Sequence, residues 1–221
     1  MLLRINNISK SFRNTNAVRN VSFDVNPGDY IAIIGPSGSG KTTLLSLLTG
    51  MLTPTGGEIL YNNKKLKSLS QRELSRIRAF DMGLVFQFSE LVPSLTVEEN
   101  ILLPGLFTRK YTETEYLKKS EYLLHTLDLE KEKDELPFML SGGQIQKTAI
   151  ARALINDPSV LLADEPSGDL DPGNSDRVQR LFSEYNKKGL TILLVTHDMQ
   201  MAYDSKTVYE MEKGSIKNIM K

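Results

Sequence analysis

The stretch that organises this chain reads Gly35-Pro36-Ser37-Gly38-Ser39-Gly40-Lys41-Thr42. It fits the pattern G-x-x-x-x-G-K-[ST], in which glycines let the backbone curl until its N–H groups surround phosphate oxygens. The flanking residues predict a strand at Tyr30–Ile34 and a helix at Thr42–Leu52, whose N-terminus adds positive potential. A ligand-free glycine-rich turn is the alternative, but it does not account for this strand and helix. The loop therefore predicts a nucleoside triphosphate site, with Lys41 on the β- and γ-phosphates and the Thr42 hydroxyl on Mg²⁺.

A second informative stretch is an apolar run that ends in two carboxylates, Val160-Leu161-Leu162-Ala163-Asp164-Glu165. Ligands of an open parallel sheet lie beyond the carboxyl ends of its strands. Asp164 would then approach Mg²⁺, directly or through a water molecule, and Glu165 could polarise the attacking water. A strand that ends in a charged turn is the alternative, and alone it would be the more common one. Together with the phosphate loop, the run indicates hydrolysis.

Two further polar residues follow apolar runs. Gln87 comes after Met82–Phe86, and His197 comes after Leu190–Thr196. Either could be a solvated strand end, but both are expected at the edge of the sheet that carries the phosphates. His125 is expected on the surface of a helix, without a partner.

A second glycine-containing motif is Leu140-Ser141-Gly142-Gly143-Gln144. Ser141 and Gln144 predict a capping box for a helix that runs to about Asn156. Two glycines in its first turn weaken such a helix by about 1 kcal/mol each relative to alanine. That cost is understandable if the helix start lies flat against an anion and offers it backbone N–H groups. Because the chain already has one phosphate loop, this helix start is predicted to serve the nucleotide of a neighbouring molecule.

Composition excludes several classes of function. The chain has 221 residues, 27 Lys+Arg against 27 Asp+Glu, two His, and neither Cys nor Trp. The balanced charge predicts no nucleic-acid partner, and the lack of Cys removes disulfides, thiolate metal sites and cysteine nucleophiles. No apolar run approaches the roughly 20 residues of a membrane span, and the N-terminus is not a secretion signal. We therefore expect a soluble, cytoplasmic chain whose partner supplies any membrane spans.

The patterning predicts an α/β fold. The apolar runs suit a mainly parallel sheet that is covered on both faces. Leu2–Phe12 and Val18–Val25 resemble antiparallel strands, and Asn62-Asn63 predicts a hairpin turn. We predict a single domain over residues 1–221. It comprises a P-loop NTPase core with an N-terminal antiparallel β-layer, at about 1–87 and 157–221, and an inserted α-helical subdomain at about 88–156.

In this order, the motifs resemble those of ATP-binding subunits of ABC transporters, and the likeness covers nearly the whole chain. They are Walker A at Gly35–Thr42, the Q-loop at Gln87, the signature at Leu140–Gln144, Walker B at Val160–Asp164, the catalytic Glu165, the D-loop at Gly168–Asp171 and the switch His197.

The resemblance implies a head-to-tail dimer with two ATP molecules at its interface. Each ATP would contact the phosphate loop of one copy and the signature residues of the other, which are Ser141, Gly142, Gly143 and Gln144. The implied nucleotide-binding residues of the first copy are Phe12, Gly35, Pro36, Ser37, Gly38, Ser39, Gly40, Lys41, Thr42 and Thr43. Phe12 stands where tyrosine is usual and keeps the ring that stacks on adenine.

The resemblance also implies the roles of the remaining polar residues. Glu165, His197 and Gln87 would be catalytic, with His197 on the γ-phosphate. Asp171 would link the two sites. Mg²⁺ would be held by Thr42, Gln87 and Asp164.

Three stretches resemble one branch of the family, which includes macrolide exporters, lipoprotein-releasing complexes, cell-division ATPases and antimicrobial-peptide resistance pumps. They are residues 69–74 together with Arg78, residues 85–88 and residues 91–104. This likeness implies a membrane permease with a large extracytoplasmic domain, driven mechanically to export or extract lipoprotein, peptide or drug. An amino-acid-type importer ATPase is the alternative, although importers usually carry Phe where this chain has Ala163. ABC ATPases that act on DNA or the ribosome, and phosphoryl-transfer kinases, fit the motifs less well.

One surface is expected to receive the permease. Phe88, Leu91, Val92 and Leu95 are apolar for a loop that follows a strand, which is consistent with a docking groove. Packing within the helical subdomain explains them equally well. The chain also departs from the branch pattern after the signature, at Ile145, Lys147 and Thr148. Lys147 stands where Arg is usual, so it keeps the charge without the forked geometry.

Overall fold

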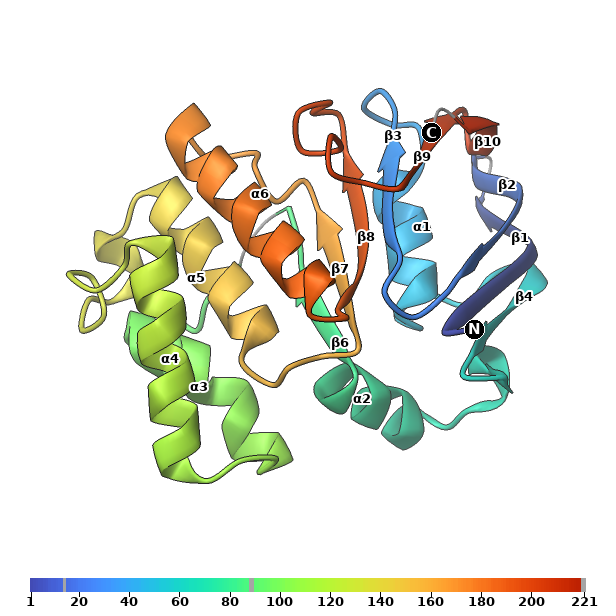
Figure 1. The fold of residues 1–221 in the computed structure, drawn as a ribbon. Helices are drawn as coiled ribbons and strands as arrows, with labels where there is room; N and C mark the ends of the chain where they lie inside the picture. The colour runs from blue at the N-terminus through green and yellow to red at the C-terminus, as the bar shows by residue number, and fades with distance from the viewer. Residues whose placement is uncertain (14, 88–89, 220–221) are drawn as a thin grey trace.

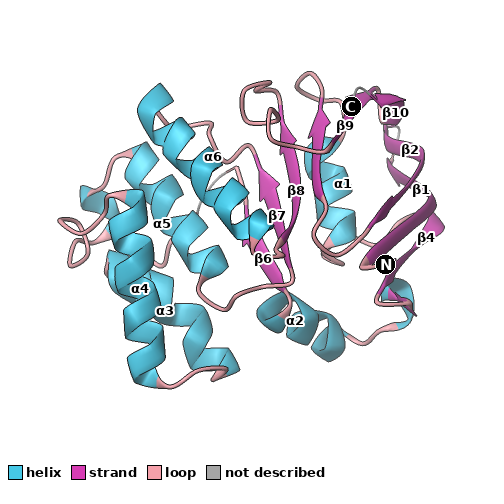
Figure 2. Ribbon diagram, in the orientation of Figure 1, coloured by secondary structure: helices cyan, strands magenta, loops and turns pink. Residues whose placement is uncertain are grey.

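The computed structural model describes residues 1–13, 15–87 and 90–219. A central sheet separates a group of helices from an antiparallel layer of strands (Figure 1). Coloured by secondary structure, helices dominate one side of the molecule and strands its centre and other side (Figure 2). This is the predicted α/β arrangement. Phe88 lies outside the described residues.

The central sheet has six strands in the order β10-β9-β3-β8-β7-β6, and all neighbours except β10 and β9 are parallel. Its strands are β3 (Tyr30–Ile34), β6 (Met82–Val85), β7 (Val160–Asp164), β8 (Thr191–Thr196), β9 (Thr207–Glu212) and β10 (Ser215–Ile219). The first four confirm predicted strands to within a residue or two. The sequence patterning had not identified β9 and β10.

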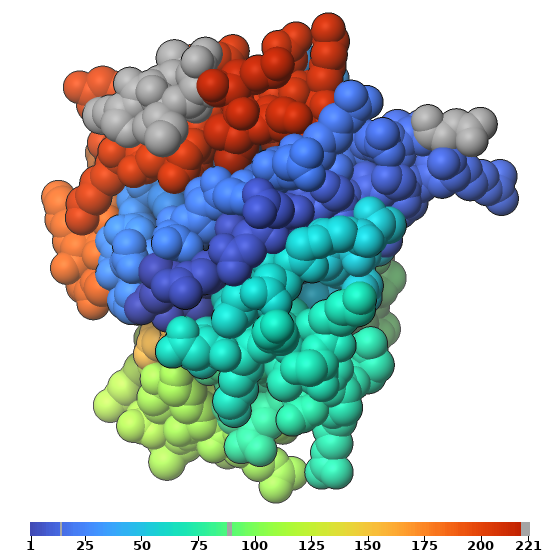
Figure 3. Space-filling view, turned by 90° about the vertical axis from the view of Figure 1, so that its right-hand side faces the viewer, coloured from blue at the N-terminus to red at the C-terminus, as the bar shows by residue number. Residues whose placement is uncertain are grey.

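The second sheet is the antiparallel layer, which forms an outer face of the molecule (Figure 3). Its order is β2-β1-β4-β5, from β1 (Leu3–Phe12), β2 (Thr15–Val25), β4 (Gly56–Tyr61) and β5 (Lys64–Lys65). Asn62 and Asn63 both have positive φ, 47° and 62°, as a tight hairpin turn requires. The predicted N-terminal β-layer and its hairpin are thus confirmed.

In the part of the chain that the structure describes, four of the six α-helices begin with a complete capping box, at Ser70, Thr96, Thr112 and Ser141. The helices are α1 (Lys41–Leu48), α2 (Gln71–Phe80), α3 (Val97–Thr108), α4 (Glu113–Leu127), α5 (Gly142–Leu154) and α6 (Pro172–Lys187), with 3₁₀ turns η1 (Leu66–Ser68) and η2 (Pro137–Met139). The first helix ends four residues before the predicted Leu52. Gly50 has φ +68°, a conformation that cannot continue a helix. Among the described residues, no helix is long and apolar enough to span a membrane.

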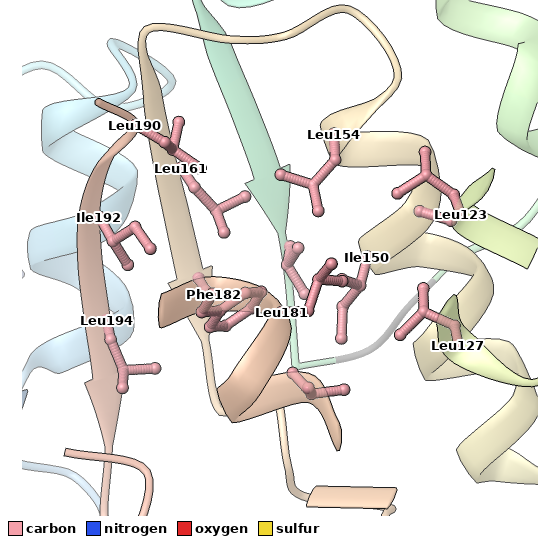
Figure 4. Close-up of a cluster of buried hydrophobic side chains, with 14 of the residues drawn as sticks. Leu123, Leu127, Ile150, Leu154, Leu161, Leu181, Phe182, Leu190, Ile192 and Leu194 are labelled. Atoms are coloured by element: carbon pink, nitrogen blue, oxygen red, sulfur yellow. The ribbon is translucent and has the colours of Figure 1, made fainter. Parts of the chain in front are cut away.

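The sheet divides the hydrophobic core in two because successive residues of each strand face opposite sides. Ala32, Leu161 and Leu194 belong to the cluster that contains α5 and α6 residues, whereas Ile33 and Leu162 belong to the cluster beneath α1 and the antiparallel layer. In the first cluster, Phe182 and Leu181 of α6 lie against the strands, and Ile150 and Leu154 of α5 continue it (Figure 4). Both faces of the sheet are therefore covered, and its carboxyl edge remains accessible.

Candidate functional site

The phosphate loop lies between β3 and α1, and glycine is required for its shape. Gly38 and Gly40 have φ of +76° and +105°. A Cβ on Gly40 would lie 2.2 Å from the carbonyl oxygen of Ala17, and one on Gly35 would lie 2.2 Å from that of Met211. The loop is thus pressed against the backbones of β2 and β9, where only glycine fits.

Lys41 opens α1 and is almost fully buried. Its Nζ donates hydrogen bonds to the carbonyl oxygens of Gly35 (2.7 Å) and Pro36 (3.2 Å), and it lies 3.8 Å from Oε1 of Glu165. The ammonium group therefore sits inside the curl of the loop, beside the end of β7. A cation in this position can neutralise phosphate charge.

Glu165 follows β7 and is held in one orientation. Its Oε2 accepts hydrogen bonds from the Thr196 hydroxyl (2.8 Å) and the His197 backbone N–H (3.2 Å). Its Oε1 lies 2.9 Å from Nδ1 of His197. The backbone of Glu165 is left-handed, with φ +48°, which costs a non-glycine residue about 1 kcal/mol or more. A strained backbone and an oriented carboxylate at one residue are typical of a catalytic position.

Asp164 is the last residue of β7 and is buried beside Thr42. Neither carboxylate oxygen accepts a hydrogen bond within 3.5 Å from the described residues. Burial raises the pKa of Asp164, the negative charge of Glu165 adds to this rise, and the Thr42 hydroxyl and Lys41 oppose it. A buried, unsatisfied carboxylate is costly unless a cation pairs with it.

Asp164 and Thr42 together fit Mg²⁺, which prefers hard oxygen ligands. No three His, Cys, Asp or Glu side chains cluster as a metal site in residues 1–13, 15–87 and 90–219. An all-protein cage is thus lacking there. Mg²⁺ commonly binds through one or two protein oxygens, water and substrate phosphates, which this pair allows.

A cleft of about 460 Å³ brings most of the predicted site together at the carboxyl edge of the sheet. The predicted residues that line it are Ser37, Gly38, Gly40, Lys41, Thr42, Thr43, Gln87, Asp164, Glu165 and His197. Gly35, Pro36 and Ser39 form the loop but are not part of the cleft lining. Phe12, with 45% of its surface exposed, pairs in the sheet with Thr15, which lines the cleft. The ring of Phe12 therefore stands beside the cleft rather than inside it.

Two basic residues of the cleft were missed in the sequence. Arg19 of β2 and Lys213, in the turn between β9 and β10, both line it. This turn is tied to the site, since the N–H of Gly214 donates to Ser39 and the N–H of Arg19 donates to Gly214. The one local sign of these residues was the turn-forming pair Lys213-Gly214. Because β9 and β10 had not been predicted, this pair could not be placed at the site. These cations make the cleft more suitable for a polyanion.

The signature residues lie elsewhere in the chain. The Ser141 N–H donates to Oε1 of Gln144 (2.8 Å), and the Gln144 N–H donates to Oγ of Ser141 (3.3 Å), so the predicted capping box is present. Ser141, Gly143, Gln144 and Asp171 line a separate cleft of about 690 Å³. Asp171 caps α6, where a hydrogen bond from the backbone N–H of Asn174 lowers the pKa of Asp171. Within one chain, the structure does not bring the signature to the phosphate loop.

Gly142 and Gly143 start α5, and Gly143 has little room for a side chain. A Cβ on Gly143 would lie 3.1 Å from the carbonyl oxygen of Asp169, so the D-loop packs against this helix start. Lys147, one turn later, is buried and donates to the carbonyl of Asp128 (3.1 Å) and Oδ1 of Asn174 (3.4 Å). A single ammonium group thus joins α5 to α6.

The structure decides one open alternative, for Leu91, and corrects one expectation, for His125. Leu91 is buried, so it packs within the chain rather than lining an open groove, while Val92 and Leu95 are half-buried. His125 is exposed as expected but has a partner, because its Nδ1 lies 2.5 Å from Oε1 of Glu130. Glu130 lies beyond the end of α4, and an i, i+5 contact of this kind is not part of the helical pattern.

Comparisons with known proteins agree with this geometry. Residues 18–168 match the sequence family described as ABC transporter. The chain is 40% identical over 215 residues, 97% of its length and 96% of the relative's, to the lipoprotein-releasing system ATP-binding protein LolD of Aquifex aeolicus (strain VF5). A dimeric structure of MJ0796, described as a bacterial ABC transporter cassette, matches with a TM-score of 0.94 and 35% identity, covering 100% of this chain and 98% of that one. The dimeric structure of a post-hydrolysis state of MJ0796 bound to ADP and Pi matches with the same TM-score and coverage at 34% identity.

Proposed function

The chain belongs to the ABC transporter family as an ATP-binding subunit that hydrolyses ATP, and from this premise we propose that it drives a membrane permease which releases lipoproteins or related extracytoplasmic substrates. The 40% identity to a lipoprotein-releasing ATP-binding protein over nearly the whole chain supports this substrate class. The branch-specific stretches, residues 69–74 with Arg78, 85–88 and 91–104, support the same choice. Through the permease the subunit would lie at the inner face of the cell membrane.

We infer that two copies pair head to tail and complete each other's ATP sites. The observation that carries this proposal is the separation of the functional residues into two clefts. One holds Lys41, Glu165 and His197, and the other holds Ser141 and Asp171. The first cleft is open to solvent, whereas hydrolysis needs a site that excludes water. A second copy whose α5 N-terminus covers the first cleft supplies both the closure and further N–H donors.

In this arrangement the residues have distinct tasks. The loop N–H groups and Lys41 bind the β- and γ-phosphates, and His197 contacts the γ-phosphate. Glu165, oriented by Thr196, accepts a hydrogen bond from the attacking water and directs its oxygen at the γ-phosphorus. Thr42 and Asp164, with Gln87 beside them in the cleft, would hold Mg²⁺, which would supply positive charge against the phosphates. Phe12 stacks on the adenine.

Glu165→Gln tests the paired site. The amide keeps the size of the side chain but cannot orient water as a carboxylate does, so we expect hydrolysis to fall by at least 100-fold and an ATP-bound dimer to accumulate. Light scattering in ATP and Mg²⁺ measures the dimer, with ADP and the variant Glu165→Gln/Lys41→Met as controls. A Glu165→Gln chain that binds ATP but stays monomeric would contradict the proposal.

The permease is identified by tagging the Glu165→Gln chain and solubilising host membranes gently in ATP and Mg²⁺. We expect mass spectrometry of the co-purified material to identify a permease with few membrane spans and a large extracytoplasmic domain. Recovery with an importer-type permease and a solute-binding protein would overturn the proposed branch. Recovery with soluble partners alone would overturn the transport role.

A further inference from the structure

Two neighbouring apolar side chains stand exposed immediately before the signature. Phe138 and Met139, in η2, expose 76% and 63% of their surfaces. Large apolar side chains are usually buried, and an exposed adjacent pair next to a functional motif is a candidate contact surface. Only Leu140 separates Met139 from Ser141, which caps α5.

Backbone hydrogen bonds hold the turn that carries this exposed pair. The N–H of Met139 donates to the carbonyl of Leu136 (2.9 Å), and the N–H of Leu140 donates to that of Pro137 (3.2 Å). Leu140 itself packs against the core cluster that contains α5 and α6. Leu140 is thus turned inward, whereas Phe138 and Met139 of the hydrogen-bonded η2 turn face outward.

We propose that Phe138 and Met139 cover the adenine base of the ATP that is bound to the phosphate loop of the partner copy. The inference rests on the proposed head-to-tail pairing. If Ser141 and the start of α5 contact the phosphates of that ATP, the Cα of Met139 lies within about 7 Å of Ser141 and that of Phe138 within about 11 Å. Both side chains can therefore reach further along the same nucleotide.

The described residues that line the cleft of the phosphate loop do not themselves cover the adenine base from both sides. Phe12 offers its ring to one face of the base, but the cleft beside it is lined by Thr15, Asn16 and Ala17, with no aromatic or large apolar side chain among its described lining residues. Among the described lining residues, no large apolar side chain is therefore available to the second face of the base. A phenylalanine ring stacks on such a face, and a methionine sulfur packs favourably against aromatic rings.

The position of the pair favours the second copy over the permease as its occupant. Because only Leu140 separates Met139 from Ser141, a partner surface that buries Ser141 comes next to Met139. The pair is thus continuous with the proposed dimer interface. Contact of the second copy with this pair requires no interface other than the proposed one.

Phe138→Trp in the Glu165→Gln background tests contact with the base directly, because the chain has no other tryptophan. We expect ATP to quench the tryptophan emission at least twofold as the dimer forms, through stacking on adenine. Ribose 5′-triphosphate, which has the phosphates but no base, should give little quenching at concentrations that form the dimer. Equal quenching by both compounds would overturn the proposal.

A second measurement uses Phe138→Ser/Met139→Ser in the same background. We expect ATP binding to the monomer to be unchanged, because the pair serves the partner's site. The ATP concentration for half-maximal dimerisation should rise about tenfold, and that for ribose 5′-triphosphate should hardly change. Leu106→Ser/Phe107→Ser is the matched control, because these α3 side chains are 70% and 75% exposed and lie outside both clefts.

The outcomes separate this inference from the proposed function. If the Glu165→Gln parent stays monomeric in ATP, both proposals fail. If the parent dimerises and the serine variant dimerises equally well, only the cover of the base is refuted. Loss of permease binding with unchanged dimerisation would assign the pair to the permease and refute the inference as well.

Discussion

Thr196 illustrates how a single residue outside the recognised motifs controls the site. It is fully buried at the end of β8, and its hydroxyl donates to Oε2 of Glu165 while accepting from the N–H of Asp198 (2.9 Å). The hydroxyl thereby fixes the carboxylate that is proposed to orient water. A buried carboxylate that loses one of its donors pays a desolvation cost of about 1–3 kcal/mol.

We therefore expect Thr196→Val to lower kcat by about tenfold with little change in KM. Valine has nearly the same shape, so packing is preserved while the hydrogen bond is lost. Thr196→Ser keeps the hydroxyl and should retain most of the activity. Steady-state phosphate release measures both variants. A valine variant with unchanged kcat would show that His197 alone suffices to hold Glu165.

The phosphate loop needs glycine for two reasons, backbone conformation and close contact, and a comparison of Gly38 with Gly40 distinguishes them. Both have positive φ, but a Cβ on Gly38 would point into open space, whereas one on Gly40 would meet the carbonyl oxygen of Ala17 at 2.2 Å. We expect Gly38→Ala to cost about 1–2 kcal/mol of unfolding free energy, from backbone strain alone. Gly40→Ala should cost clearly more and weaken ATP binding by at least tenfold, because the loop must move away from β2.

Chemical denaturation and calorimetric ATP titration of the two alanine variants check this prediction. Similar losses at the two positions would mean that strain, and not the contact with Ala17, determines the effect.

Some residues of the site belong to short sequence motifs, whereas others reach the site only through contacts between distant parts of the chain. The phosphate loop, the Walker B carboxylates and the signature are short contiguous motifs, so their positions could be read from the sequence. Thr196 enters the site through the parallel register of β8 with β3, which places it opposite Ile34. Arg19 and Lys213 enter through the packing of β2 on the β9–β10 turn. Pairings between strands that are far apart in the sequence produce no recognisable motif around the paired residues.

At the scale of elements, Asn100 of α3 holds the segment that follows the Q-loop. Its fully buried side chain donates to the carbonyls of Val92 (3.2 Å), Leu95 (2.9 Å) and Thr96 (2.9 Å), and it accepts from the N–H of Val92 (2.8 Å). One amide thus organises a turn that has little other regular structure. The buried Leu91 lies just before it.

Asn100→Ala should lower the free energy of unfolding by about 3 kcal/mol, because several buried backbone groups lose their partner at once. Ser94→Ala in the same segment changes an exposed side chain and should have an effect below about 0.5 kcal/mol. Urea denaturation followed by circular dichroism compares the two. Equal stability of both variants would show that the turn relaxes to hydrate its backbone.

The capping box of α4 predicts a pH effect with a definite sign. The backbone N–H and the hydroxyl of Thr112 donate to Glu115 and lower the pKa of its carboxyl. The carboxylate therefore stabilises the folded chain above its usual pKa of about 4.3, and this contribution is lost as the pH falls through the lower pKa of the folded state. Glu115→Gln should remove that part of the pH dependence.

We expect Tm to fall less steeply from pH 6 to pH 3.5 in Glu115→Gln than in the parent. Glu113→Gln removes a charge from the same helical turn without touching the capping box, and it should keep the parent's slope. Parallel Tm profiles for the parent and Glu115→Gln would argue against a stabilising carboxylate.

The elements themselves were predictable where propensity and tertiary packing agree. The capping box at Ser141 marked a helix start, and buried apolar runs marked β3, β6, β7 and β8. The strand β9 was missed because its burial is mixed, with only Val208 and Met211 buried. Strand β10 lies at an edge of the sheet and pairs only with β9.

For the whole molecule, the separation of the two clefts makes a specific prediction about mixed dimers. Lys41→Met damages the phosphate-loop half of a site, and Ser141→Arg damages the signature half. In a head-to-tail dimer of one chain of each kind, both changes fall in the same composite site. The other site, with an intact Lys41 from one chain and an intact Ser141 from the other, remains whole.

In the Glu165→Gln background, each variant alone should therefore stay monomeric in ATP, whereas an equal mixture should form dimers that hold one ATP each. The reciprocal control is a tagged Lys41→Met/Ser141→Arg chain mixed with the untagged parent, in which each composite site carries one damaged half. This tagged chain should capture no ATP-bound parent. Light scattering measures the amount of dimer, and radiolabelled ATP measures the number of ATP molecules bound per dimer. If the doubly changed chain captures ATP-bound parent while the single variants fail to pair with each other, each chain holds ATP with its own signature. That result would contradict the head-to-tail arrangement, because the two arrangements place the one intact site in opposite mixtures.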